Sequence, residues 1–288
     1  MKLLYMGTAA AEGIPALFCD CEFCHRARAA GGREIRTRSG AMIDGVLKLD
    51  FGPDSYLHML RESIGYAGLR SVLITHTHGD HLALDELGYR GPFFANLPED
   101  APPLTVYGNG ELSRRLESKL SDRLAYRQIR PFEPVMIEGY RVTALEAVHC
   151  LNAKSGQWPV TFEGSVYTRS EEALFYLVEK DGQSILYAHD TDEFTPADME
   201  YLAGKRIDLI SMDCTNGVLD LEYIGHMGAN DNLRMREKLL ANGAADGHTL
   251  FVASHFSHNG CAELAELERA LPGFTIAWDG LTLETPSA

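Results

Sequence analysis

Residues 76–81 read His-Thr-His-Gly-Asp-His, and no other stretch of the chain constrains its fold so tightly. The five residues before it, Ser-Val-Leu-Ile-Thr, show the apolar, β-branched pattern of a buried strand. Alternate residues of an extended chain point to the same side, so His76 and His78 can face one metal ion. Asp80 and His81 follow where the chain turns. Imidazole and carboxylate suit zinc, manganese and iron, so the stretch predicts two ligand pairs for two adjacent metal ions.

Together with Thr75, the stretch resembles the T-H-x-H-x-D-H motif of the metallo-β-lactamase superfamily. The resemblance implies an α/β fold, the αββα sandwich, in which two mixed sheets lie between helix layers. It also implies a single domain over residues 1–288. Short apolar strands alternate with amphipathic helical stretches along the chain, which agrees with that architecture. The alternative is that four polar residues meet in a loop by chance.

The family pattern implies three further ligands, each placed after a strand-like segment. The implied ligand groups are His76, His78 and His149 for one ion, and Asp80, His81 and His255 for the other, with Asp190 bridging both. His189 precedes Asp190 and is the alternative bridging residue. We favour Asp190, because an anionic carboxylate can bridge two cations.

Such a metal pair implies hydrolysis. Two ions roughly 3.5–4 Å apart can share a hydroxide nucleophile and stabilise the oxygens of an in-line displacement. Histidine and aspartate suit both zinc and manganese, so the sequence leaves the identity of the two divalent ions open.

Three cysteines predict a second, structural metal site. Cys19, Cys21 and Cys24 form C-x-C-x-x-C, a spacing typical of zinc sites. Three thiolates need a fourth ligand to complete a tetrahedron, and we expect His258, with His25 as the alternative. The competing interpretation is three reduced cysteines that bind no metal.

The combination of C-x-C-x-x-C, T-H-x-H-x-D-H and Ser-His-Phe-Ser-His at residues 254–258 resembles the PhnP phosphodiesterase group of the superfamily. The similarity extends from Tyr5 to His258. It implies hydrolysis of a small or cyclic phosphodiester, the group's substrates including cyclic phosphates of ribose. The alternatives are a lactone or thioester hydrolase, a transfer-RNA 3′-processing nuclease, and a non-catalytic metal protein like the accessory members that serve coenzyme biosynthesis.

Two residues near the end of the chain are candidates for proton transfer. Asp213 closes a strand-like segment, and His226 lies in Gly-His-Met-Gly just before a predicted helix. Related phosphodiesterases carry a histidine in this region that is thought to protonate the leaving alkoxide. With Asp80, these two residues form the predicted catalytic set, although His226 could instead be a surface histidine that caps the helix. Asp50 begins a D-x-G-x-D turn and is expected to support the metal loop without binding metal.

Charge and composition limit the partners. The formal net charge is −15 and the sequence pI is about 5.1, whereas proteins that grip long nucleic acids carry basic stripes. We therefore expect a small anionic substrate. Residues 33–38 form a small basic cluster, interpreted as a solvated loop with a phosphate-binding patch as the alternative.

The sequence also predicts a cytoplasmic protein without a membrane partner. No stretch approaches the roughly 18 apolar residues of a membrane helix, and the first residues lack the apolar run of a signal peptide. Six cysteines in such a chain favour metal binding over a disulfide framework. The oligomeric state, including a homodimer, is left open.

Some residues receive only minor roles. Residues 151–172 lack a clear pattern and are interpreted as an irregular lid, whose Trp158 and Tyr167 are candidates for substrate contact. The residues without an assigned function are His58 and His248, expected at the surface, and Cys150, Cys214 and Cys261, expected to be buried or incidental.

Overall fold

The first strand, β1 (Lys2–Gly7), shows why this chain forms sheets that are covered on both faces. Leu3 and Tyr5 point into one apolar cluster, whereas Met6 and the partly buried Leu4 point into another. Because side chains alternate along a strand, apolar residues at both parities require cover on both sides. The computed structural model, which describes residues 1–151, 158–221 and 224–286, has two such sheets packed face to face.

The first sheet has seven strands in the order β16-β1-β2-β3-β4-β5-β6. Besides β1 they are β2 (Gly40–Ile43), β3 (Leu47–Leu49), β4 (Ser71–Leu73), β5 (Leu104–Gly108), β6 (Leu124–Gln128) and β16 (Thr282–Glu284). Strands β16 to β3 pair antiparallel and β3 to β6 pair parallel, so the sheet is mixed. Asp44 and Gly45 form the turn between β2 and β3, and both have positive φ, at 49° and 69°.

The second sheet also has seven strands, in the order β15-β14-β13-β12-β11-β8-β7. They are β7 (Val135–Ile137), β8 (Tyr140–Glu146), β11 (Leu174–Lys180), β12 (Gln183–Ala188), β13 (Leu209–Asp213), β14 (Leu250–Ser254) and β15 (Phe274–Ile276). Strands β12 to β15 are parallel and the others antiparallel. Parallel neighbouring strands end at the same edge of the sheet, and the candidate site lies at this edge.

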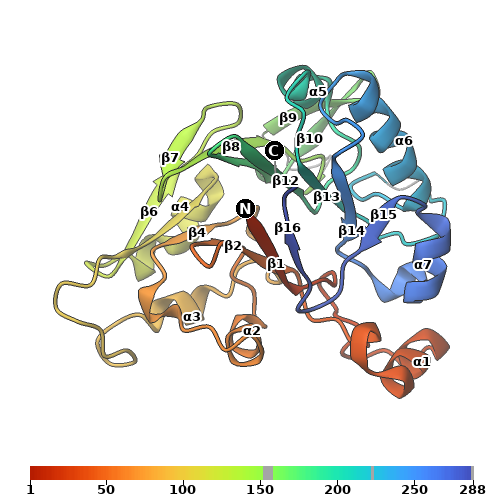
Figure 1. Ribbon diagram of the computed structural model, residues 1–288. Coiled ribbons are helices and arrows are strands. Elements are labelled where there is room, and N and C mark those ends of the chain that lie inside the picture. The colour runs from red at the N-terminus through yellow and green to blue at the C-terminus, as the bar shows by residue number, and fades with distance from the viewer. Residues whose placement is uncertain (152–157, 222–223, 287–288) are drawn as a thin grey trace.

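Helices cover the outer faces of both sheets (Figure 1). They are α2 (Ser55–Arg61), α3 (Leu84–Gly88), α4 (Gly110–Leu116), α5 (Pro196–Leu202), α6 (Ala229–Ala241) and α7 (Leu264–Ala270), whereas α1 (Glu22–Ala30) lies below α7 in Figure 1, beyond the sheets. Leu87 of α3 and Leu112 of α4 pack on the first sheet, whereas Leu202 of α5 and Met235 of α6 pack on the second. The predicted αββα sandwich is confirmed. Among the described residues, no helix is long and apolar enough to cross a bilayer.

The prediction of an irregular lid over residues 151–172 is wrong for much of its length. β9 (Trp158–Phe162) and β10 (Ser165–Arg169) form a two-stranded antiparallel hairpin. Its turn is Glu163-Gly164, with φ of 47° and 75°, and Val160 and Phe162 pack against Val148. The alternation of buried and exposed residues in β9 is a strand pattern that sequence analysis overlooked. Residues 152–157 lie outside the described residues.

Two other surface predictions are also wrong. Within the basic cluster, Arg36 is buried and donates to Thr8 Oγ1 at 3.0 Å and to the carbonyl of Ala277. His58 is only 2% exposed, and its Nε2 lies 2.8 Å from Thr37 Oγ1. Both residues bind segments distant in sequence, which local patterns do not reveal.

Candidate metal centre

The candidate ligands lie just beyond the carboxyl ends of strands from both sheets. His76 follows β4, His149 follows β8, Asp190 follows β12 and His255 follows β14. Asp190 and His255 have φ of 53° and 62°. This left-handed conformation costs roughly 1–2 kcal/mol for a residue with a Cβ, and such strain clusters at functional sites.

His76, His78 and His149 form the first group, here called the three-histidine group. Their ring centroids are 4.4 Å apart for His76 and His78, 4.9 Å for His76 and His149, and 5.1 Å for His78 and His149. His149 Nε2 lies 3.3 Å from His78 Nδ1. The three imidazoles therefore meet at one point, as ligands of a single ion would.

Asp80, His81 and His255 form the second group, here called the mixed group, and Asp190 lies between the two groups. Asp190 Oδ2 is 2.7 Å from His81 Nε2 and 2.9 Å from His255 Nε2. Its other oxygen, Oδ1, is 3.5 Å from His149 Nε2. Asp80 Oδ2 lies 3.0 Å from His81 Nε2. Asp190 thus presents one oxygen to each group, which is the position of a bridging ligand.

Four atoms of these candidate ligands are buried and have no hydrogen-bond partner in the part of the chain that the structure describes. They are Nε2 of His76, His81 and His255, and Oδ2 of Asp190. Several lie within 3 Å of one another, yet not in hydrogen-bond geometry, so they converge on a common centre. An unsatisfied buried polar atom costs about 1–3 kcal/mol. The donor set therefore fits two divalent metal ions, which would satisfy all four atoms.

The other ring nitrogen of four ligand histidines is held by an oxygen. The partners of Nδ1 are Thr75 for His76 at 3.0 Å, Asp50 for His81 at 2.7 Å, Gly225 for His149 at 3.2 Å and Thr215 for His255 at 2.8 Å. Such contacts fix the ring orientation and direct Nε2 at the metal.

The electrostatics of the site also favour cations. Burial lowers the pKa of His76 well below its ordinary value and that of His149 to about 4, so both imidazoles are neutral and ready to bind metal. Burial alone would lower the pKa of His255 too, but Asp190 and Asp213 outweigh it and raise that pKa to about 10. Metal binding at His255 would therefore displace a proton.

Residues 76–81 are here called the metal stretch. Asp50 and Gly52 hold this stretch from the side of the first sheet. Asp50 is fully buried and accepts hydrogen bonds from Thr75 N at 2.8 Å and His81 Nδ1 at 2.7 Å. The supporting role predicted for Asp50 matches these contacts. Gly52 lies so close to the stretch that a Cβ there would come 1.8 Å from the carbonyl oxygen of Asp80.

This close approach yields a prediction about two glycines. Gly52→Ala is expected to displace Asp80 and so to weaken metal binding. It should also lower the free energy of unfolding by about 1–3 kcal/mol. Gly79→Ala is the matched control, because a Cβ at Gly79 meets nothing within 4 Å. Thermal melts and metal titrations of both variants check this. Wild-type stability and metal content in Gly52→Ala would contradict it.

Asp213 and His226 come together beside Asp190. His226 Nδ1 lies 3.1 Å from Asp213 Oδ2 and 3.9 Å from Asp190 Oδ1. Burial lowers the pKa of His226, but the Asp213 carboxylate outweighs burial and raises it above the ordinary value. Asp213 is fully buried and also accepts from Thr215 N at 2.9 Å and Met227 N at 3.1 Å. The carboxylate is thus fixed and can orient the imidazole.

The two groups and His226 open into one cavity of about 450 Å³. Polar residues complete its wall, namely Glu12, Thr215, Asn216, Ser257 and Asn259. Its volume falls within the ~300–1,000 Å³ typical of small-ligand pockets. The arrangement can therefore take a small polar molecule next to the candidate metal ligands and next to His226.

The cysteine cluster lies behind the same segment that carries His255. Cys21 is the N-cap of α1 and Cys24 lies in its first turn. His258 Nδ1 is 3.4 Å from Cys19 Sγ and 3.8 Å from Cys21 Sγ. The backbone N–H of Cys24 lowers the pKa of Cys21 to about 6, which favours its thiolate. Three sulfurs and one imidazole nitrogen lie within 4.8 Å of one another, which fits a tetrahedral zinc site.

Comparison with known proteins identifies the family of this chain. Residues 49–256, which include the metal stretch and His255, match the model of the β-lactamase superfamily domain. The chain belongs to the β-lactamase superfamily.

Relatives that cover the whole chain share its metallo-β-lactamase fold. The chain is 25% identical to coenzyme PQQ synthesis protein B of Methylobacterium radiotolerans, over 98% of this chain and 99% of that protein. A crystal structure of a new diphosphatase from the PhnP family has a TM-score of 0.72 and 23% identity, and covers 99% of this chain and 98% of that one. Zn(2+)-bound PqqB from Methylobacterium extorquens has a TM-score of 0.66 and 22% identity, covering 99% of this chain and 100% of that one.

His189, the alternative to Asp190, and His25, the alternative to His258, have other contacts in the structure. Both ring nitrogens of His189 contact serines, Ser39 at 3.3 Å and Ser211 at 2.8 Å. His25 is exposed and pairs with Asp20 at 2.7 Å. Asp190 and His258, respectively, occupy the positions beside the ligand groups.

The residues given minor roles have mixed outcomes. His248 is exposed as expected, Cys214 is buried and Cys261 is exposed. Trp158 and Tyr167 lie on the β9–β10 hairpin and are not among the residues that line the cavity. Cys150, however, is buried next to His78 together with Glu171, which sequence analysis did not single out.

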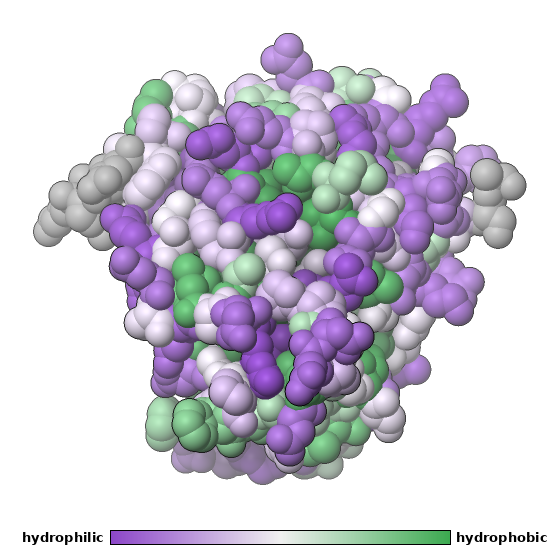
Figure 2. All heavy atoms as spheres, turned by 90° about the vertical axis from the view of Figure 1, so that its left-hand side faces the viewer, coloured by the Kyte–Doolittle hydropathy of each residue, from purple (hydrophilic) through white to green (hydrophobic). Residues whose placement is uncertain are grey.

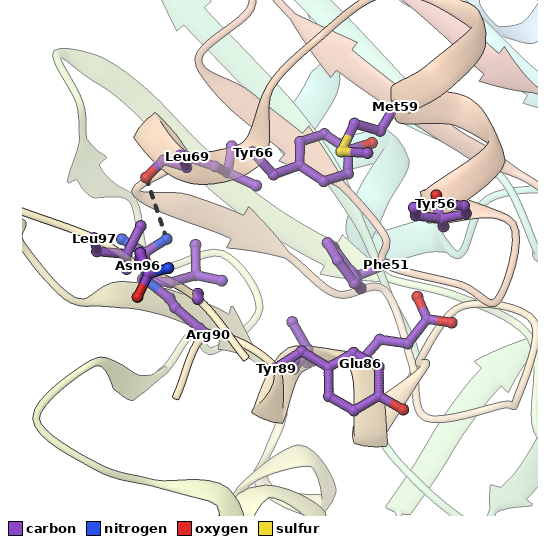
Figure 3. A pocket seen from close by; sticks show the side chains of 14 residues that line it. Phe51, Tyr56, Met59, Tyr66, Leu69, Glu86, Tyr89, Arg90, Asn96 and Leu97 are labelled. Atoms are coloured by element: carbon purple, nitrogen blue, oxygen red, sulfur yellow. Dashed lines mark hydrogen bonds between the residues drawn. The ribbon is translucent and has the colours of Figure 1, made fainter. Parts of the chain in front are cut away.

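A second cavity is separate from the metal centre. It measures about 410 Å³ and is mostly apolar, lying between α2, α3 and residues 89–97, with Phe51, Tyr66 and Tyr89 in its wall (Figure 3). Figure 2 views the molecule from the left-hand side of Figure 1 and shows hydrophobic patches among mainly hydrophilic residues. The wall of this cavity carries none of the candidate metal ligands.

Proposed function

We propose that this protein is a metal-dependent phosphodiesterase that cleaves a small or cyclic phosphodiester. The observation that carries the proposal is the Asp213–His226 pair, which lies in the same cavity as Asp190 and the two ligand groups. Hydrolysis of a diester with an alkoxide leaving group needs a proton donor on that group.

Each residue of the site has a role in this proposal. The three-histidine group would hold one ion and the mixed group the other, with Asp190 between them. Two divalent ions would supply an activated water nucleophile and positive charge opposite the phosphoryl oxygens. His226 would donate a proton to the leaving oxygen from Nε2, since Nδ1 is held by Asp213.

The remaining predictions are proposed with it. The similarity to a PhnP-family diphosphatase supports phosphorus chemistry, and the −15 net charge argues against long nucleic acids. The divalent ions are zinc or manganese, and the cysteine cluster holds a structural zinc ion. That zinc site requires reduced cysteines, which the cytoplasm maintains.

A second candidate is a role in coenzyme synthesis without hydrolysis. The whole-chain similarity to coenzyme PQQ synthesis protein B favours it. The complete set of candidate ligands, with a proton donor beside it, favours hydrolysis instead.

A substrate screen distinguishes these functions. Protein loaded with zinc or manganese is incubated with bis-aryl phosphodiesters, cyclic nucleotides, lactones and thioesters, and metal-stripped protein is the control. We expect cleavage of phosphodiesters that depends on the added metal. Opening of lactones or thioesters without phosphodiester cleavage would contradict the proposal, and inactivity towards all substrates would favour the coenzyme role.

A further inference from the structure

The buried carboxylate of Glu171 contacts the metal stretch at Thr77, whereas Asp50 contacts Thr75 and His81. Glu171 lies just before β11 and is 4% exposed. Its Oε1 accepts from Thr77 N at 3.0 Å and from Thr77 Oγ1 at 3.1 Å. Thr77 stands between His76 and His78, so Glu171 fixes the backbone from which both ligands project.

Asn109 fixes Glu171 in turn. Asn109 is the N-cap of α4, and its Oδ1 accepts from Leu112 N at 3.0 Å. That bond determines which way the amide points, so Nδ2 faces Glu171 and donates to Oε2 at 3.1 Å. Within residues 1–151, 158–221 and 224–286, the structure shows no ion pair of Glu171 with a lysine or arginine. Its charge is therefore held by hydrogen-bond donors.

Cys150 connects Glu171 to His78. Its Sγ lies 3.6 Å from Glu171 Oε1 and 3.7 Å from His78 Nε2. Cys150 has a φ of 57° and is 8% exposed, so the chain accepts a strained backbone to place this thiol. The thiol can donate to the carboxylate and accept from the imidazole, which completes a chain of contacts from Glu171 to His78.

His78 differs from the other four ligand histidines in its orientation. They have Nδ1 held by oxygen, whereas His78 has Nδ1 towards His149 and Nε2 towards Cys150. His78 is also the exposed residue of the three-histidine group. Without Cys150, none of these contacts would hold Nε2 of His78.

We propose that Glu171 and Cys150 are positioning residues that orient His78 and set the affinity of the three-histidine group for its ion. The proposal rests on the metal pair of the proposed function but not on its substrate. Asp50, which follows β3, and Glu171, which precedes β11, are then two buried carboxylates that support the metal stretch at different residues.

Cys150 could instead bind the metal itself, because its Sγ lies within 4.8 Å of ligand nitrogens of the three-histidine group. The geometry favours the positioning role. Cys150 contacts the Nε2 edge of His78, while Nδ1 of the same ring faces His149 and the common centre.

Metal titrations of full-length variants test the proposal independently of activity. Glu171→Gln and Cys150→Ala are expected to bind zinc at the three-histidine group about 10–100-fold more weakly, the usual effect of removing such a support. Cys150→Ser should recover part of this affinity, because a hydroxyl can also donate and accept. Glu172→Gln and Cys261→Ala are matched controls, since neither side chain contacts the stretch in the described structure, and should bind as the wild type does.

Cobalt spectra and thermal melts complete the experiment. With cobalt in both the centre and the cysteine cluster, Cys150→Ser should keep the wild-type sulfur-to-cobalt absorption, because that absorption then comes from the cysteine cluster alone. Wild-type affinity in Glu171→Gln and Cys150→Ala, or no recovery in Cys150→Ser, would overturn the proposal, and so would a loss of sulfur-to-cobalt absorption. If Glu171→Gln fails to fold, the two Cys150 variants decide. Failure of the wild type itself to bind metal here would instead contradict the proposed function.

Discussion

Replacing His76 by alanine is expected to abolish metal-dependent cleavage of a bis-aryl phosphodiester. His76 Nε2 is buried, has no hydrogen-bond partner among the described residues and belongs to a neutral imidazole, so we expect it to bind metal. Its loss leaves the three-histidine group with two imidazoles. If metal catalysis supplies about 4 kcal/mol of transition-state stabilisation, kcat/KM should fall by at least about 10³-fold. Initial rates and metal content, measured with zinc and with manganese, check this.

Two control variants show whether the effect belongs to His76. His248→Ala changes an exposed histidine outside both metal clusters and should keep wild-type rates and metal content. Cys24→Ser should lose the ion of the cysteine cluster while the three-histidine group keeps its own. A His76→Ala variant that still cleaves phosphodiesters at the wild-type rate would show that the proposed centre is not the active site.

The resemblance to the superfamily implied the candidate ligands, and strand order explains why they lie close together in the structure. His149, Asp190 and His255 each follow a segment with an apolar strand pattern, and strands of packed sheets bring such positions to one edge. The D-x-G-x-D turn of the superfamily indicated Asp50, which follows β3 directly. These predictions came from the family resemblance together with local strand patterns.

The supports of the site were harder to predict because they depend on contacts between distant segments. Glu171 contacts Thr77, which is 94 positions away, and Cys150 contacts His78, which is 72 positions away. Neither residue belongs to a spacing pattern of its own. His58 looked like a surface histidine for the same reason, since nothing near it in sequence announces its burial beside Thr37.

His226→Ala is the second variant with a large expected effect, and the effect should depend on the leaving group. Loss of a general acid typically costs about 10²–10⁴-fold in rate. The full loss is expected for a diester with an alkyl alcohol as leaving group, because an alkoxide is a strong base that must be protonated. An aryl leaving group such as nitrophenolate departs without a proton, so its rate should fall much less.

Metal content separates this role from metal binding. His226 lies 3.1 Å from Asp213 but 3.9 Å from Asp190, so it stands outside both ligand groups. His226→Ala should therefore keep its central ions, whereas Asp213→Asn should disturb His255 as well, because Asp213 Oδ2 is 3.2 Å from His255 Nδ1. An equal loss of rate for alkyl and aryl diesters, or a loss of metal from His226→Ala, would contradict the general-acid role. A rate loss confined to alkyl diesters, with metal retained, requires that His226 deliver its proton to the leaving oxygen.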